Sequence, residues 1–275
     1  MSNMQNRTVF ITGGSRGIGR AIALACAREG ANVVIAAKSD QPHPKLPGTI
    51  HSVAEEIRQA GGKALPLVLD VRDEKLVRQR VDEAADHFGS IDALVNNAGA
   101  IKLTGVENLK ASRYDLMHQV NARAVFVCSQ AALPWLKESD RAHILSLSPP
   151  LNLDPRWFAQ YGPYTTTKYA MTMLSMGMAE EFRRYGIAVN TLWPKTLIAT
   201  AAIEFEVGGP QMMAQGRKPE IMADAALSIL SRPAEQMTGQ SVIDEDVLQA
   251  DGVTDFEHYR YEAGDKPLMP DLFLD

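Results

Sequence analysis

The stretch TVFITGGSRGIGRAIALACAREG, residues 8–30, decides the fold. Its first residues are β-branched or aromatic and predict a short strand, residues 20–29 favour a helix, and Gly30 ends that helix. In a strand–turn–helix of this kind, glycines let the backbone approach a pyrophosphate, and the helix N-terminus supplies N–H donors. The stretch therefore predicts a dinucleotide-binding unit at the start of the chain.

The glycines of this loop have the spacing G-x-x-x-G-x-G, which differs from the commoner G-x-G-x-x-G. A structural turn without a ligand is the alternative interpretation, and the flanking strand and helix argue against it. The loop residues that we expect to bind the cofactor are Gly13, Ser15, Arg16, Gly17, Ile18 and Gly19.

The rest of the chain repeats the alternation of strand and helix. Strands are predicted at residues 32–37, 64–69, 91–95, 143–147, 187–192 and 240–243, and helices at residues 49–60, 73–87, 112–136, 164–185 and 221–230. Mostly apolar strands between helices indicate a parallel sheet covered on both faces. We therefore predict an α/β, single-domain Rossmann-type doubly wound sheet over residues 1–275. Its core covers about residues 7–245, and a C-terminal extension follows at about 246–275.

Composition excludes several classes of protein. The 275 residues carry a formal net charge of -5, which argues against a nucleic-acid-binding protein. No apolar run reaches the ~20 residues that span a bilayer, and the N-terminus is too short and polar for a signal peptide. Cys26 and Cys128 lie in apolar helical runs, so we expect no disulfide scaffold and a cytoplasmic protein. The six histidines show no metal-ligand spacing.

The end of the second strand predicts the cofactor. An acid there would bind the ribose 2′-hydroxyl of NAD, whereas a cation would accommodate the 2′-phosphate of NADP. Residues 34–39 contain no acid and end in Lys38 and Ser39, and Arg16 adds a second cation from the glycine loop. We therefore predict NADP(H) over NAD(H), with two solvated surface charges as the alternative.

Tyr164 and Lys168 are four residues apart and share one face of a predicted helix. A tyrosine has an ordinary pKa of ~10, and a neighbouring ammonium group favours the phenolate and lowers that pKa. A phenol tuned in this way can serve as acid or base near neutral pH. A surface pair without chemistry is the alternative.

The glycine loop, the run Asn96-Asn97-Ala98-Gly99, Asn121 and the Tyr164–Lys168 pair together resemble the short-chain dehydrogenase/reductase superfamily over residues 7–245. The resemblance implies hydride transfer between a nicotinamide cofactor and an alcohol or carbonyl. It implies that Tyr164 donates or accepts the proton. Lys168 would lower its pKa and hold the nicotinamide ribose, and Asn121 would position a water. Further cofactor contacts are expected from Asp70, Val71, Asn97, Ala98, Gly99, Pro194 and Thr196. A helix cap is the alternative role for Asp70.

Four further runs, at residues 37–46, 143–153, 193–196 and 270–275, resemble a hydroxysteroid dehydrogenase-like branch of this superfamily. Animal members of the branch carry an additional sterol-carrier domain after this point, so the resemblance implies the free-standing bacterial type. Some bacterial members are assigned to oxidation of acyclic terpene alcohols such as citronellol.

Two positions depart from the superfamily pattern. The usual catalytic serine stands 13 residues before the tyrosine, where this chain has Leu151; aligned by the strand, it falls on Pro149, next to Ser148. We predict Ser148 as the catalytic hydroxyl, with a capping role as the alternative. Lys195 replaces a usual glycine, and we expect it either to contact the cofactor or an acidic substrate group, or to face solvent.

Apolar side chains surround the predicted reaction site. Residues 196–220 carry Met212 and Met213, and Trp157 and Phe158 precede the tyrosine. This favours a lipid-like or terpenoid alcohol, aldehyde or ketone, with core packing as the alternative.

The two long predicted helices resemble those through which the superfamily forms dimers and tetramers. The displaced serine favours a second function, a weakly active or inactive cofactor-binding scaffold. We expect residues 255–275 to cover a pocket or a neighbouring subunit.

Overall fold

Seven strands form one sheet in the order β3-β2-β1-β4-β5-β6-β7 in the computed structural model, which describes residues 4–274. Every neighbouring pair is parallel. The strands are β1 (Thr8–Thr12), β2 (Asn32–Ala37), β3 (Lys63–Val68), β4 (Ala93–Asn96), β5 (His143–Ser146), β6 (Ala188–Trp193) and β7 (Ser241–Ile243). The predicted doubly wound parallel sheet is therefore confirmed.

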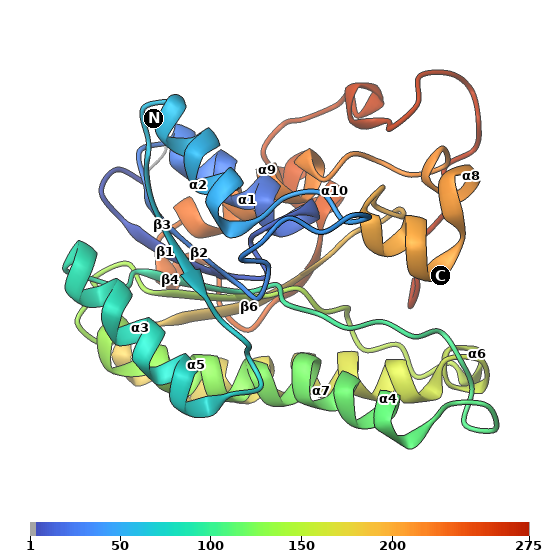
Figure 1. Cartoon of the computed structure of the whole chain (residues 1–275), viewed down its shortest axis with the longest axis horizontal. Helices are drawn as coiled ribbons and strands as arrows, with labels where there is room; N and C mark the ends of the chain where they lie inside the picture. The colour runs from blue at the N-terminus through green and yellow to red at the C-terminus, as the bar shows by residue number, and fades with distance from the viewer. Residues whose placement is uncertain (1–3, 275) are drawn as a thin grey trace.

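Helices cover both faces of the sheet (Figure 1). One face carries α1 (Gly17–Arg28), α2 (Ile50–Gln59), α9 (Glu220–Ser231) and α10 (Asp244–Ala250). The other carries α3 (Glu74–Phe88), α4 (Ala111–Met117), α5 (Ala124–Leu136) and α7 (Gly162–Glu181). Within β1, Val9 and Ile11 pack into the first layer and Phe10 into the second, so the strand is buried on both faces.

Side-chain caps begin two helices where the sequence predicts them. The hydroxyl of Thr49 accepts a hydrogen bond from the backbone N–H of Ser52 at 3.0 Å, and Asp73 accepts one from Leu76 at 3.0 Å. Each cap satisfies an N–H group that the first turn of a helix leaves without a partner. Asp73, and not Asp70, therefore caps α3, so the alternative role for Asp70 is wrong.

The predicted helix 112–136 has an internal irregularity. A π-helical turn, η1 (His118–Arg123), separates α4 from α5, and Pro134 lies inside α5 without ending it. Pattern reasoning missed α6 (Pro155–Ala159), α8 (Gly209–Met213) and α10, which are too short to show a full amphipathic period. The remaining short turns are η2 (Arg183–Tyr185), η3 (Ile203–Val207), η4 (Ala234–Gln236) and η5 (Glu257–Tyr259).

The strand order determines where a ligand binds. β1 pairs with both β2 and β4. The chain therefore adds β2 and β3 on one side of β1 and then adds β4 and the later strands on the other side. Open α/β sheets bind ligands outside the carboxyl ends of the strands at such a switch point. Within residues 4–274, no helix is both long and apolar enough to cross a membrane. Cys26 and Cys128 are buried free thiols.

His143, at the start of β5, makes folding stability depend on pH. Its side chain is 1% exposed, and burial, reinforced by the charge of Arg7, lowers the pKa of His143 from 6.5 to about 4. The unfolded chain therefore binds this proton at higher pH, and stability present above pH 6.5 is lost as the pH falls toward 4. We expect His143 to account for a loss of about 1.4 kcal/mol between about pH 7.5 and 5.5.

Urea unfolding at the two pH values measures this loss. His143→Gln should lose less stability than the wild type over that interval, while the exposed His87→Gln should behave as the wild type. Equal pH dependence in the wild type and His143→Gln would contradict the assignment.

Candidate active site

The glycine loop after β1 is shaped for close approach by a ligand. Gly13 and Gly17 have φ values of +68° and +53°, which side chains rarely adopt. A Cβ atom on Gly19 would lie 2.5 Å from the carbonyl oxygen of Gly13, so only glycine fits there. α1 begins at Gly17 without a side-chain cap, which leaves its first N–H groups available to an anion.

The turn after β4 holds this loop in place. The side-chain nitrogen of Asn97 donates to the carbonyl oxygens of Thr12 at 2.8 Å and Gly13 at 3.0 Å. The hydroxyl of Thr12 accepts from the backbone N–H groups of Asn97 and Ala98. Asn97 therefore positions the glycine loop, and the loop and the turn form one rigid surface.

Arg16 ties the glycine loop to the proline-rich segment that follows β2. Its guanidinium donates to the hydroxyl of Ser39 at 2.7 Å and to the carbonyl oxygens of Pro47 at 2.9 Å and Gly48 at 3.2 Å. Lys38 is exposed directly after β2. Arg16 and Ser39 therefore meet at the carboxyl end of β2, next to Lys38 in the chain, and a 2′-phosphate site there stays a prediction.

Asp70 lies at the neighbouring strand end and is paired. Its carboxylate accepts from the guanidinium of Arg72 at 2.6 Å. This bond, more than the charge of nearby Lys38, holds the pKa of Asp70 below its usual value. Asp70 is thus an ionised acceptor at the carboxyl edge, next to the buried Val71.

Tyr164 and Lys168 are both buried on α7 at the same edge of the sheet. The ammonium group of Lys168 donates to the carbonyl oxygen of Leu147 at 2.6 Å. Burial lowers the pKa of Lys168 to about 8, against the opposing effect of Asp271. Burial also raises the pKa of Tyr164 above its usual value, and the charge of Asp271 adds to this effect.

The direction of the Tyr164 shift corrects one expectation. The sequence resemblance implies that Lys168 lowers the pKa of Tyr164, but here the pKa of Tyr164 is raised. The reason is that Tyr164 is desolvated, and the negative charge of Asp271 adds to this effect.

Asn121 lies in the π-helical turn and joins three elements. Its side-chain oxygen accepts from the backbone N–H of Ala100 at 2.8 Å, and its nitrogen donates to the carbonyl oxygen of Ala100 and the hydroxyl of Thr167, each at 2.9 Å. π-helical turns occur frequently at functional sites. Asn121 fixes the loop after β4 beside α7, and a water held by it stays a prediction.

Ser148 lies deeper than the sequence pattern suggests. It is fully buried, and its hydroxyl accepts from the hydroxyl of Thr172 at 3.0 Å. Thr172 is eight residues beyond Tyr164 on α7, which corresponds to about 12 Å along a helix axis. The structure therefore groups Ser148 with Thr172, and Ser148 as the catalytic hydroxyl stays a prediction.

Lys195 and Thr196 follow β6 and differ in their contacts. The ammonium of Lys195 pairs with Glu245 at 2.7 Å, and its backbone N–H donates to Asp244 at 2.8 Å, so Lys195 is held by α10. The hydroxyl of Thr196 is buried and has no partner among residues 4–274. Together with the buried Pro194, it offers a ligand an unused hydrogen-bonding group.

The C-terminal segment contributes residues that pattern reasoning missed. Phe273 is 1% exposed and stacks on the ring of Tyr164, with centroids 6.3 Å apart. The nearby Asp271 is partly buried, and its desolvation raises its pKa to about 7. The aromatic content of the last twenty residues indicated a covering segment, but no local pattern indicated its target.

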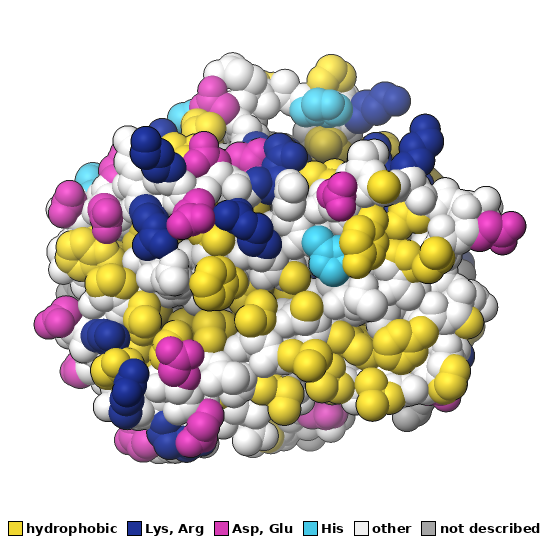
Figure 2. Space-filling view, turned by 90° about the horizontal axis from the view of Figure 1, so that it is seen from below, with side chains coloured by type: hydrophobic (Ala, Val, Ile, Leu, Met, Phe, Trp, Pro, Cys, Tyr) yellow, Lys and Arg dark blue, Asp and Glu magenta, His cyan; other side chains and the backbone are white. Residues whose placement is uncertain are grey.

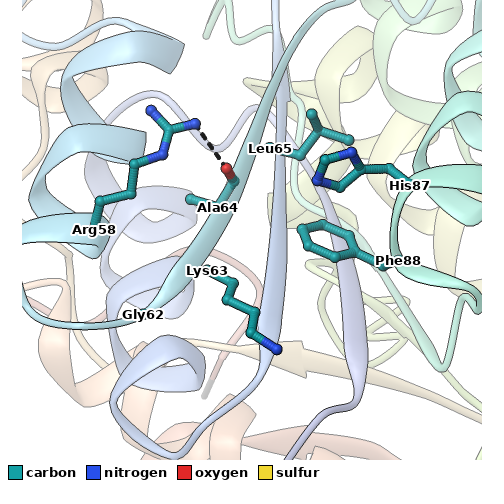
Figure 3. Close-up of a pocket in the computed structure, with 7 residues that line it drawn as sticks. All are labelled: Arg58, Gly62, Lys63, Ala64, Leu65, His87 and Phe88. Atoms are coloured by element: carbon teal, nitrogen blue, oxygen red, sulfur yellow. Dashed lines mark hydrogen bonds between the residues drawn. The ribbon is translucent and has the colours of Figure 1, made fainter.

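Two surface cavities lie away from these residues. The larger, about 380 Å³, opens at the amino end of β3 between α2 and α3, and Figure 3 shows its lining side chains. At this cavity the guanidinium of Arg58 donates to the carbonyl oxygen of Ala64 at 2.9 Å, and the ring of His87 packs edge-on against that of Phe88. A second, of about 310 Å³, lies between α1 and α2. Neither is at the carboxyl edge of the sheet.

Comparison with known proteins identifies the family. Residues 7–205 match the family model described as short chain dehydrogenase. The chain belongs to the short-chain dehydrogenase/reductase family. Members of this family are oxidoreductases that bind nicotinamide cofactors.

Curated relatives confirm the resemblance to the hydroxysteroid dehydrogenase-like branch. Hydroxysteroid dehydrogenase-like protein 2 of Danio rerio is 56% identical over 268 residues, which are 98% of this chain and 64% of that protein. The human protein of the same name is 55% identical over the same length. This chain thus spans less than two thirds of these relatives.

Solved structures share the fold. A short chain dehydrogenase of Mycobacterium thermoresistibile is 48% identical, with a TM-score of 0.93 over 99% of this chain and 96% of that chain. A short chain dehydrogenase of Burkholderia cenocepacia, solved in complex with NADP, is 27% identical, with a TM-score of 0.75 over 88% of this chain and 97% of that chain.

Proposed function

We propose that this protein is an NADP(H)-dependent oxidoreductase that interconverts an apolar alcohol with its aldehyde or ketone, with Tyr164 as general acid and base. The observation that carries the proposal is the burial of Tyr164 and Lys168 on one helix, at the sheet edge where the glycine loop and the unpartnered Thr196 hydroxyl also lie. A nicotinamide cofactor bound along this edge would contact the glycine loop, the Thr196 hydroxyl and the Tyr164–Lys168 pair.

The residues that would hold the cofactor fit its parts. The first N–H groups of α1 suit a pyrophosphate, and Thr196 suits the amide of a nicotinamide. Arg16, Lys38 and Ser39 suit a 2′-phosphate, and the NADP complex of the Burkholderia cenocepacia relative supports the same choice. When bound, the nicotinamide would supply the hydride acceptor or donor.

In the direction of alcohol oxidation, the phenolate of Tyr164 would take the hydroxyl proton as the carbon-bound hydrogen leaves as hydride, and a carbonyl forms. In the reverse reaction the carbonyl carbon would receive the hydride, and Tyr164 would give the proton to the carbonyl oxygen. Lys168, which keeps its proton below its pKa of about 8, would favour the phenolate through its positive charge. Asn121 would hold the loop that faces them and a water for the proton.

The walls of the site support an apolar substrate. Tyr164 belongs to a hydrophobic cluster that contains Met117 and Trp193 and borders Ile101 and Leu103. Such walls favour aliphatic or terpenoid molecules over sugars, because a sugar's hydroxyl groups would lose water without gaining partners.

We propose that the protein forms a homodimer or homotetramer through the layer of α5 and α7. Figure 2 shows hydrophobic side chains spread over this face. Phe126 of α5 is 50% exposed, and Met173 and Met176 of α7 are 62% and 51% exposed. Large exposed apolar side chains that gather on one face favour association. Sedimentation equilibrium tests this proposal, and a monomer at micromolar concentration would contradict it.

The absorbance of NADPH at 340 nm tests the proposed reaction with a panel of aliphatic and terpenoid alcohols and aldehydes. Turnover that requires Tyr164 is the expected result. The burial of Ser148 favours one alternative, a cofactor-binding scaffold without turnover. Cofactor binding in the absence of any turnover across the panel would support that alternative.

Ser148→Ala tests the displaced serine. A hydroxyl that bonds the developing alkoxide would contribute ~10²–10³-fold to kcat. Because the hydroxyl of Ser148 is buried against Thr172, we expect kcat to fall by less than about fivefold, with some loss of thermal stability. A loss of a hundredfold or more in kcat, measured at a temperature where the variant is folded, would show that Ser148 does act on the substrate.

A further inference from the structure

The C-terminal segment 269–274 is bound to the loop that follows β6. The backbone N–H of Leu197 donates to the carbonyl oxygen of Met269 at 2.9 Å, and the backbone N–H of Met269 donates to the carbonyl oxygen of Gln215 at 2.9 Å. Asp271 donates to the carbonyl oxygen of Lys195 at 3.1 Å. In Figure 1 the red C-terminal segment accordingly ends beside α8. The segment is therefore part of the surface that surrounds Thr196.

Phe273 fills a cage of aromatic rings. Its centroid lies 5.3 Å from Tyr169, 5.7 Å from Trp157 and 5.8 Å from Trp193, and its ring stacks on Tyr164. The indole nitrogen of Trp193 donates to the carbonyl oxygen of Leu272 at 3.0 Å. Side chains from α6, α7 and β6 thus hold one ring at the reaction site.

The backbone of Phe273 supports a fixed position. Its φ is +74°, a conformation that bulky residues adopt only where the surroundings impose it. The side chain of Asn152 donates to its carbonyl oxygen at 3.3 Å. A ring that is fully buried and contacted on several sides forms a wall beside Tyr164.

The position of Phe273 leaves one part of Tyr164 for a substrate. The ring face of Tyr164 is covered, whereas its hydroxyl has no hydrogen-bond partner among the described residues and is not fully enclosed. A substrate must therefore bring its hydroxyl or carbonyl to the end of the phenol while its carbon skeleton passes beside Phe273. A wide ring system at this place would meet the phenyl ring, whereas a linear chain is narrower.

We propose that Phe273 is a specificity-determining residue that restricts Tyr164 to slim aliphatic alcohols and aldehydes and excludes bulky polycyclic ones. This proposal rests on the proposed oxidoreductase function and specifies its substrate class. It predicts that a smaller side chain at position 273 widens the site and that a larger one narrows it further.

The experiment compares two primary alcohols, octan-1-ol and adamantane-1-methanol, in the wild type, Phe273→Ala and Phe273→Trp. We expect the ratio of kcat/KM for the bulky alcohol to that for the linear alcohol to rise about 10- to 100-fold in Phe273→Ala and to fall in Phe273→Trp. Phe256→Ala removes a phenylalanine that packs on Tyr259 and Arg217, away from Tyr164, and should leave the ratio unchanged. If Phe273→Ala does not fold, Phe273→Leu takes its place. The ratio of kcat/KM for the two alcohols should then rise by a smaller factor.

A binding measurement separates this proposal from the proposed function. Trp157 and Trp193 contact the C-terminal segment, so tryptophan fluorescence can follow alcohol binding in the presence of NADPH, with which an alcohol does not react. Absence of turnover in the wild type would contradict the proposed function alone. If the ratio of the two alcohols, in turnover or in binding, stays within about twofold across the Phe273 variants, the specificity proposal is wrong.

Discussion

Tyr164→Phe is expected to lower kcat/KM by about 10²–10⁴-fold, because it removes the proposed proton donor and acceptor. The phenyl ring keeps its contact with Phe273, so the fold and the affinity for NADPH should change little. The rate is measured from NADPH absorbance, and the affinity from the fluorescence of the bound nucleotide.

Tyr185→Phe is the matched control for this variant. Tyr185 lies in η2 beyond α7, where Lys137 sits 4.0 Å over its ring, and its hydroxyl has no part in the proposed reaction. We expect its rate to equal that of the wild type. A Tyr164→Phe protein that keeps more than about a tenth of the wild-type rate would remove Tyr164 from the mechanism.

Lys38→Asp is expected to reverse the preference between the two cofactors. A charge-assisted contact with a phosphate is worth about 1.5–3 kcal/mol, and the new carboxylate adds repulsion toward the 2′-phosphate. The ratio of kcat/KM for NADPH to that for NADH should therefore fall at least about 100-fold. Lys38 is exposed, so this change tests the phosphate contact without disturbing the Arg16 bonds to the proline-rich segment.

Lys45→Asp makes the same change of net charge at an exposed position of the proline-rich segment. Its cofactor ratio should stay within about threefold of the wild type, since exposed charges are screened by salt over about 10 Å. A wild-type enzyme that prefers NADH, or a Lys38→Asp variant with an unchanged ratio, would refute the assignment of the 2′-phosphate site.

Local patterns were sufficient for the elements that the site is built on. The spacing of Gly13, Gly17 and Gly19 predicted the turn into α1, since their backbone angles and close contacts depend on the glycines themselves. The cap at Thr49 is confirmed, because a cap is an interaction between residues three apart, whereas the cap of α3 at Asp73 was found only in the structure. Alternating apolar strands and helices likewise predicted the layers of the sheet.

Local patterns do not indicate contacts with distant partners. The hydroxyl of Ser148 is bonded to Thr172 of α7. Lys195 is exposed, which agrees with the solvent-facing alternative, and Glu245 of α10 binds its ammonium group. Neither partner is indicated by the residues next to Ser148 or Lys195, so only the packed structure shows these contacts.

The sequence by itself determined the doubly wound sheet, the nucleotide loop and the pair Tyr164 and Lys168, because these follow from backbone geometry and from spacing along one helix. Only the tertiary structure decided what surrounds that pair. It buries both groups, which raises the pKa of Tyr164 and lowers that of Lys168, and it brings Phe273 from the end of the chain onto the phenol ring. Desolvation and long-range packing depend on the whole fold, and no short stretch of residues encodes them.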